Sequence, residues 1–149
     1  LYEGEKMNMA LQIFCCLIAA EFAYIFYLET VIPDSGTTAK VFGMDVKDLK
    51  MPAMKTAMKN QGVYNLGIAV FLILAAFVLH SKYAVAGLLA YIVCVALYGS
   101  FTVSKTIILK QGGLAIIALI LCFFRAVLQL MRNNAGIYGY IAGYIEDKR

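Results

Sequence analysis

Residues 9–32 read MALQIFCCLIAAEFAYIFYLETVI, and this stretch decides the fold class. A helix that crosses the hydrocarbon core of a bilayer needs about 20 consecutive, mostly apolar residues. Three more stretches meet this criterion, so spans are predicted over residues 9–32, 62–79, 83–103 and 112–131. These spans use most of the chain. The sequence therefore predicts an all-α, integral membrane four-helix bundle that forms a single domain over residues 1–149.

The composition of the whole chain agrees with this class. Of 149 residues, 62% are hydrophobic and 15% are charged, and the mean hydropathy is +0.79. A soluble domain is about half apolar and roughly a quarter charged. The net charge of +4 comes without the dense basic face that nucleic-acid binding needs, so no nucleic-acid partner is expected. A signal peptide is the rival interpretation of residues 9–32, but the apolar run is too long for one.

Metal sites and familiar catalytic motifs find little support in the sequence. The one histidine is His80, and the four cysteines fall within predicted spans without a CxxC pair. Buried cysteines acting as small apolar residues are the favoured interpretation. No Ser–His–Asp set, HExxH, P-loop or GxGxxG motif is present. We therefore predict no metal site, and the sequence leaves the cofactor and any catalytic residues open.

Loop lengths and basic residues set the predicted topology. The second and third loops are short, which makes the last three spans antiparallel neighbours, whereas the first loop is long. Lys and Arg residues number seven on the side of the first and third loops and six on the other side. The positive-inside rule thus favours, by a small margin, a multi-pass protein of the cell membrane with loops one and three in the cytoplasm.

Two segments outside the spans are predicted to lie at the membrane interface. Residues 52–60 form an amphipathic extension of the second span, because Met51, Met54 and Met58 recur at helical spacing. Residues 132–149 alternate glycine with tyrosine and are too glycine-rich to span again, so they are expected to place tyrosines among the lipid head groups. A cloning-derived end is the alternative for this tail.

Polar side chains gather at one end of the predicted bundle. Glu21 and Glu29 lie inside the first span, where carboxylates are costly and are usually functional. Following the chain through four spans brings the end of span one, the start of span two, the end of span three and the start of span four to the same membrane side. The candidate ligand-binding residues there are Glu21, Tyr24, Glu29, Asn60, Gln61, Tyr64, Asn65, Tyr98, Thr102, Lys105 and Gln111.

Helical spacing predicts partners within this cluster. Lys105 is the candidate partner of Glu29, and Tyr98 that of Glu21. The functional interpretation is a water-accessible polar pocket between the helices. The alternative is a set of interhelical hydrogen bonds that fix packing and nothing more. That alternative explains the amides well, but it explains poorly a carboxylate at the mid-depth position of Glu21.

The same polar segments carry a family resemblance. Order and spacing agree over residues 11–124, and the matching stretches are EFAYIFYLE (21–29), KVFG (40–43), NQGVYN (60–65), YGSFT (98–102) and Gln111. They resemble a family of small four-helix bacterial membrane proteins, the domain of unknown function 1304. This chain has Phe22 and Leu114 where the family pattern has histidine and proline. The resemblance implies a membrane location and four helices but no activity, and the missing histidine weakens any metal or acid–base role.

Three functions are compatible with these features. The favoured one is a homo-oligomeric protein that binds or transports a small molecule or cation at the polar pocket. The first alternative is a membrane enzyme that acts on a lipophilic substrate with a soluble cosubstrate. The second alternative is a structural subunit of a larger membrane complex. Membrane lipids are expected partners in all three cases.

Overall fold

The computed structural model describes residues 7–102 and 112–147, and these residues are helical apart from short connections. The elements in chain order are α1 (Met9–Phe26), the π-helix η1 (Tyr27–Val31), α2 (Gly36–Phe42), α3 (Val46–Leu49), α4 (Pro52–Ile73), the π-helix η2 (Leu74–Val78), α5 (Lys82–Thr102) and α7 (Gly113–Asp147). Four stretches are long and apolar enough to cross a membrane: Met9–Val31, Pro52–Val78, Lys82–Thr102 and Gly113–Tyr138. The predicted all-α class with four candidate spans is confirmed, and it indicates a multi-pass membrane protein.

Local sequence signals place the ends of the helices. Asn8, Ser35 and Asp45 precede α1, α2 and α3, and the side chain of each accepts a hydrogen bond from a backbone N–H of the first turn. Such caps satisfy N–H groups that have no partner within the helix. Gly43 ends α2 with φ of 68°, a left-handed conformation that favours glycine. Pro52 opens α4, as its fixed φ predicts.

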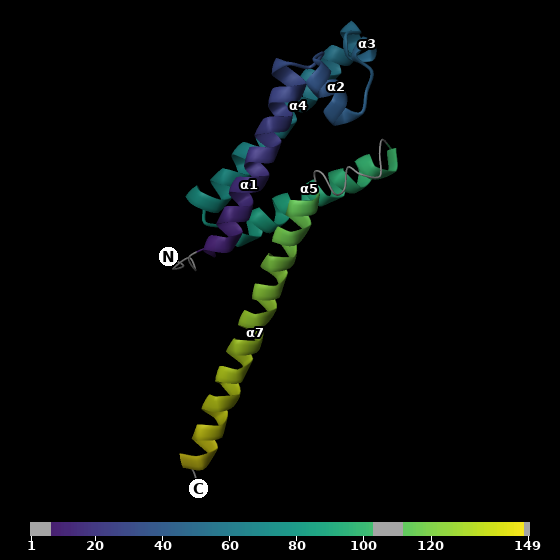
Figure 1. Ribbon diagram of the computed structural model, residues 1–149. Coiled ribbons are helices and arrows are strands. Elements are labelled where there is room, and N and C mark those ends of the chain that lie inside the picture. The colour runs from purple at the N-terminus through teal and green to yellow at the C-terminus, as the bar shows by residue number, and fades with distance from the viewer. Residues whose placement is uncertain (1–6, 103–111, 148–149) are drawn as a thin grey trace.

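The main core lies where α1 and α4 run side by side (Figure 1) and where the starts of α5 and α7 close on them. Small residues on α4, η2 and α7 allow this close packing, while larger residues on α1 and α5 fill the space between the helices. The buried members are Leu11, Cys15, Ile18, Ala19, Phe22, Ala69, Leu72, Ala75, Ala76, Val85, Leu89, Ile92, Ala115 and Ala118. The core thus occupies the half of the molecule where α1 begins.

The helices α5 and α7 diverge from the α1–α4 pair, as Figure 1 shows. Within the described residues, no Cα of α5 approaches a Cα of α1 within 8 Å. The first turns of α7, with Ala115 and Ala118, share the core with the first half of α5. In the second half of α5 the side chains are partly or largely exposed, apart from the buried Ala96. Phe101 near the end of α5 is accordingly 87% exposed. This differs from the predicted arrangement, in which the end of span three would lie beside the end of span one.

The first loop folds onto the start of α4 and forms a small separate core. Ala39 of α2, Leu49 of α3 and Met58 of α4 are buried together, and Met54 packs against them. The methionine stripe therefore packs mainly on the protein's own loop, although Met51 is exposed. The interfacial interpretation of residues 52–60 overlooked this contact, because α2 and α3 carry few apolar residues. The helix itself runs from Pro52 into the second span without a break, as predicted.

The fourth helix is longer than the span that was predicted for it. The helix α7 continues past residue 131, through Gly136, to Asp147. Figure 1 shows its far end well away from the other helices. The glycine- and tyrosine-rich tail is thus helical over residues 132–147, and its location at the membrane interface stays a prediction.

Candidate functional site

The candidate site is built at the end of α1, where the helix widens into the π-helix η1. The backbone N–H of Ile32 donates to the carbonyl of Tyr27 over 3.2 Å, five residues back. This widening turns two neighbouring residues, Leu28 and Glu29, toward the interior together. Single π-helical turns within α-helices occur frequently at functional sites. Here the π-turn brings a carboxylate into the contact between α1 and α4.

Glu29 is buried against Asn65 of α4. Their side chains are 4% and 5% exposed, and Nδ2 of Asn65 donates to Oε2 of Glu29 over 2.7 Å. A hydrogen bond from a neutral amide orients a carboxylate without balancing its charge. In the described part of the chain no ion pair involves Glu29. Glu29 and Asn65 were both predicted as site residues, but the predicted partner was Lys105, which lies outside the described residues.

Gly62 brings the backbone of α4 against the π-turn. A Cβ atom placed on Gly62 would lie 3.1 Å from Cβ of Glu29 and 3.3 Å from Cβ of Thr30, and it would overlap Oγ1 of Thr30. The Thr30 hydroxyl donates to the carbonyl of Lys59 over 3.3 Å, one turn before Gly62. The segment NQGVYN therefore supplies both the close contact, through Gly62, and the polar partner of the carboxylate, through Asn65 three residues later.

A buried hydroxyl supports the π-turn from the first loop. Thr38 is fully buried, and its Oγ1 lies 2.7 Å from the carbonyl oxygen of Ile32 and 3.1 Å from that of Leu28. Carbonyls at the end of a helix have no partner within the helix. Oγ1 also lies 3.0 Å from Oγ of Ser35, the residue that caps α2. The start of α2 is thereby connected to the end of η1.

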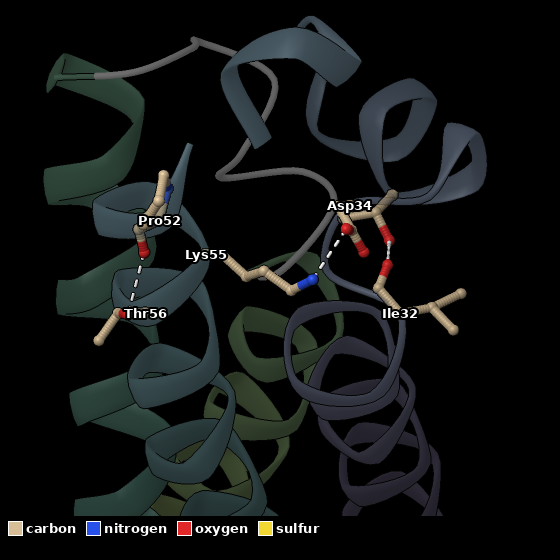
Figure 2. Close-up of polar contacts among 6 residues, drawn as sticks. Ile32, Asp34, Pro52, Lys55 and Thr56 are labelled. Atoms are coloured by element: carbon tan, nitrogen blue, oxygen red, sulfur yellow. Dashed lines mark hydrogen bonds and ion pairs between the residues drawn. The ribbon is translucent and has the colours of Figure 1, made fainter. Parts of the chain in front are cut away.

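An ion pair connects the same loop to α4. Nζ of Lys55 lies 2.8 Å from Oδ2 of Asp34, and Figure 2 shows the two side chains reaching toward each other between the turn after Ile32 and the first turns of α4. The hydrogen bond from Lys55 lowers the pKa of the Asp34 carboxyl below its ordinary value. Both side chains are partly exposed, so this pair closes the outer side of the site.

Glu21 lies deeper in the same span, roughly 12 Å along the helix from Glu29. Its carboxylate is only partly exposed, and Oε2 is buried with no hydrogen-bond partner among the described residues. A buried oxygen without a hydrogen bond is costly. The predicted partner Tyr98 is 72% exposed. No hydrogen bond joins these two described side chains, so the predicted Glu21–Tyr98 pair is not formed.

The other predicted site residues do not converge. The structure brings Glu29 and Asn65 together and leaves the remaining described members exposed on the surfaces of α1, α4 and α5: Tyr24, Asn60, Gln61, Tyr64, Tyr98 and Thr102. Hydroxyl Oγ1 of Thr102 donates to the carbonyl of Tyr98 within α5. Lys105 and Gln111 lie outside the described residues. The divergence of α5 accounts for this result, because helical periodicity fixes faces but not crossing angles.

Three contributors escaped the sequence analysis of the site. Thr30 and Thr38 act through hydroxyl contacts to backbone carbonyls, and Gly62 acts by having no side chain. The turn residues Pro33-Asp34-Ser35 could have pointed to Thr38, because a turn at this place brings the following helix back over the end of α1. Within the described residues, no group of three or more His, Cys, Asp or Glu side chains could hold a metal ion.

Comparison with known proteins shows the family to which the chain belongs. Residues 16–123 match the family model described as protein of unknown function (DUF1304). The chain belongs to this family. Residues 16–123 of this DUF1304 protein contain both carboxylates of the first span, the first loop and Asn65.

A curated relative of this chain also has no known function. The chain is 48% identical over 119 residues to the uncharacterized protein YpaA of Lactococcus lactis subsp. lactis (strain IL1403). The aligned region covers 79% of this chain and 100% of YpaA. No solved structure matches the chain. The match to this family confirms the resemblance found in the sequence. The family has no known function, and the four apolar helices indicate that this member is a multi-pass membrane protein.

Proposed function

We propose that this DUF1304 protein binds and moves a small cation, or a small molecule that carries a positive charge, at the two carboxylates of the first span, Glu21 of α1 and Glu29 of η1. The observation that carries the proposal is the buried Glu29 carboxylate, oriented by an uncharged amide inside a helix that can span a membrane. Glu21 supplies a second carboxylate farther along the same helix. Together they would form two successive binding points between the first loop and the middle of the membrane.

The charge balance of the site favours a positively charged ligand. An ionised carboxylate in a low-dielectric interior needs an opposite charge or a proton. In the part of the chain that the structure describes, one lysine of this region, Lys55, is already paired with Asp34, and no ion pair involves Glu29. A cation from solution, or a proton that exchanges with it, would therefore complete the site. Such competition between a proton and a cation is the elementary step of coupled transport.

Binding of tetraphenylphosphonium, a lipophilic cation, to the purified full-length chain in detergent tests the proposal by isothermal titration calorimetry. We expect saturable binding that weakens as the pH falls, because protons compete for the carboxylates. Glu29→Gln keeps an oxygen for Asn65 but removes the charge, so affinity should fall about tenfold or more, equivalent to about 1.4 kcal/mol. Glu21→Gln should weaken binding in the same direction.

The matched control is Asp48→Asn, which removes one negative charge from the exposed surface of α3 and should bind like the unmodified chain. A parallel titration with Na⁺ distinguishes a lipophilic cation from an inorganic one. Equal affinity of the unmodified chain, Glu29→Gln and Glu21→Gln for both probes would rule out the proposal. Circular dichroism melting of each variant verifies that the helices are intact.

The membrane-enzyme alternative receives no comparable support. Glu21 and Tyr98 could have served it as an acid–base pair, but Tyr98 is 72% exposed on a helix that diverges from α1. The structural-subunit alternative predicts a partner protein in gentle detergent. A cation-binding function instead predicts that the chain purifies alone or with copies of itself, and the binding measurement above does not depend on that outcome.

A further inference from the structure

A cavity lies at the end of the molecule opposite Glu29, where α1 and α5 begin. Its volume is about 950 Å³, and its walls come from the start of α1, the turn before α5 and the middle of α7. Asn8 at this end and Glu29 at the other are about 30 Å apart along the helix, at 1.5 Å per residue. This cavity is therefore separate from the carboxylate site and needs its own explanation.

The cavity is lined by positively charged side chains. Arg125, Gln129 and Arg132 follow one face of α7 at spacings of four and three residues. Nζ of Lys82, at the start of α5, donates to Oε1 of Gln129 over 3.4 Å, which brings another cationic group to the same wall. His80 in the preceding turn also lines the cavity. The lining residues within the described chain include no aspartate or glutamate.

The position of Arg125 makes this charge unusual. It lies inside the candidate span Gly113–Tyr138. No ion pair of the described residues involves Arg125 or Arg132. A guanidinium within an apolar segment requires an anionic partner or access to water. Its planar set of N–H donors matches the oxygens of a phosphate better than those of a single halide ion.

The remaining walls are apolar. They include Met7 and Leu11 of α1, Ala86 of α5, and Leu119 and Cys122 of α7. A cavity with cationic and amide groups on one wall and apolar side chains on the others fits a molecule with an anionic head and an apolar remainder. In a membrane protein this combination is typical of phospholipid recognition between helices.

We propose that this cavity binds a phosphate group, held by Arg125 and Arg132 with the amide of Gln129 beside them. The phosphate is carried either by an anionic phospholipid or by a small soluble molecule, and both sources share the same chemistry at the arginines. The apolar walls favour the phospholipid. The site would fix an anionic lipid between α7 and the starts of α1 and α5, where α7 leaves the main core.

Native mass spectrometry of the full-length chain, with added dioleoylphosphatidylglycerol or dioleoylphosphatidylcholine, tests the lipid source. Titration with glycerol 3-phosphate in detergent tests the soluble one. We expect phosphatidylglycerol to bind at least about tenfold more tightly than phosphatidylcholine, since each basic side chain adds roughly 1 kcal/mol of attraction to an anionic lipid. The double variant R125Q/R132Q should lose this preference.

A matched double variant, K40Q/K47Q, removes the same charge from the exposed surface of the first loop and should keep the preference. R125K/R132K keeps the charge but loses the planar donors, so it should bind with intermediate affinity. Arg125 and Arg132 are both exposed, so R125Q/R132Q should fold. If circular dichroism shows that it does not, R132Q alone replaces it.

Two results support the proposal, and each identifies a source of the phosphate. Arginine-dependent binding of phosphatidylglycerol identifies the lipid, and arginine-dependent binding of glycerol 3-phosphate identifies the soluble molecule. Two results overturn it. One is a preference for phosphatidylglycerol that R125Q/R132Q retains or that K40Q/K47Q also loses. The other is the absence of binding of either phosphate compound by the unmodified chain.

Discussion

Gly62 and Thr30 decide, at the scale of single residues, how closely α4 approaches the π-turn. There is no room for a Cβ on Gly62, because Thr30 and Glu29 occupy the space. By contrast, a Cβ on Gly67, five residues later on the same helix, would meet nothing within 4 Å. The two glycines have the same backbone conformation and opposite surroundings, so they form a natural pair for an experiment.

We expect Gly62→Ala to lower the free energy of unfolding by about 1–3 kcal/mol, the usual cost of overpacking a tight contact. Adding Thr30→Ala should restore part of this loss, because the two changes are coupled. Gly67→Ala should instead be neutral or stabilise by up to about 1 kcal/mol, since alanine favours helix more than glycine does. Unfolding of each purified variant in detergent, followed by circular dichroism, measures these changes. Equal effects of the two substitutions would show that the contact at Gly62 is unimportant.

Glu29 also shows how far sequence can predict the site at residue scale. Its functional interest follows from a carboxylate in an apolar run, and Asn65 follows from helical spacing. Their hydrogen bond was not predicted, because it depends on the extra residue that η1 inserts into the helix. A one-residue π-turn rotates the following side chains by about 100°. No sequence pattern marked that rotation.

At the scale of elements, η1 depends on a helix that follows it in the chain. Thr38 of α2 is the described side chain that supplies a hydroxyl to the carbonyls of Leu28 and Ile32. The π-helix and α2 are therefore one structural unit, joined through the turn that also carries Asp34. The ion pair with Lys55 then attaches this unit to α4.

Thr38→Val should loosen this unit without changing its volume. We expect a loss of about 1–3 kcal/mol in the free energy of unfolding, because the buried carbonyl of Leu28 would lose its hydroxyl donor. The carbonyl of Ile32 would keep the backbone N–H of Ser35. Hydrogen exchange should accelerate at the amides of η1 more than at those of α5. Thr37→Val, an exposed neighbour on the same helix, is the control and should change neither quantity. Identical exchange at η1 in both variants would contradict the role of the Thr38 hydroxyl.

The spans were the most predictable elements, and their mutual arrangement was the least. Hydropathy locates helices in a membrane because each span must satisfy its own backbone hydrogen bonds. Tyr98 lies on the helix that was predicted, yet it is 72% exposed and makes no hydrogen bond with Glu21. Crossing angles follow from the shapes of the side chains packed between helices, such as Ala115 and Ala118 of α7 and Leu89 of α5, which share the main core. A list of helical faces does not contain that information.

At the scale of the whole molecule, much apolar surface faces outward. A shallow groove of about 430 Å³ between α1 and α4 is lined by small and apolar side chains, among them Ala19, Ala20, Ala23 and Ala69. Small residues let helices from neighbouring chains approach closely in a membrane. Beyond Leu128, the exposed apolar side chains of α7 include Leu130, Met131 and Ile137.

We expect the protein to be a homo-oligomer in gentle detergent, with the α1–α4 groove in the contact. Light scattering during size-exclusion chromatography measures the mass of the protein part of the particle. Ala20→Phe would fill the groove with a bulky side chain and should shift the population toward monomer. Ile117→Phe places the same side chain at an exposed position of α7 outside the groove and is the control. A monomeric unmodified chain would contradict this expectation.

The hydrogen bond between Glu29 and Asn65 also bears on the order of events during synthesis. The two residues are 36 positions apart, so the ribosome completes the carboxylate roughly two to seven seconds before its amide, at 5–20 residues per second. A first helix that entered the bilayer alone would carry Glu29 there without its partner. The pair therefore favours entry of α1 and α4 together, as a hairpin that leaves the insertion machinery only after residue 65 has been made.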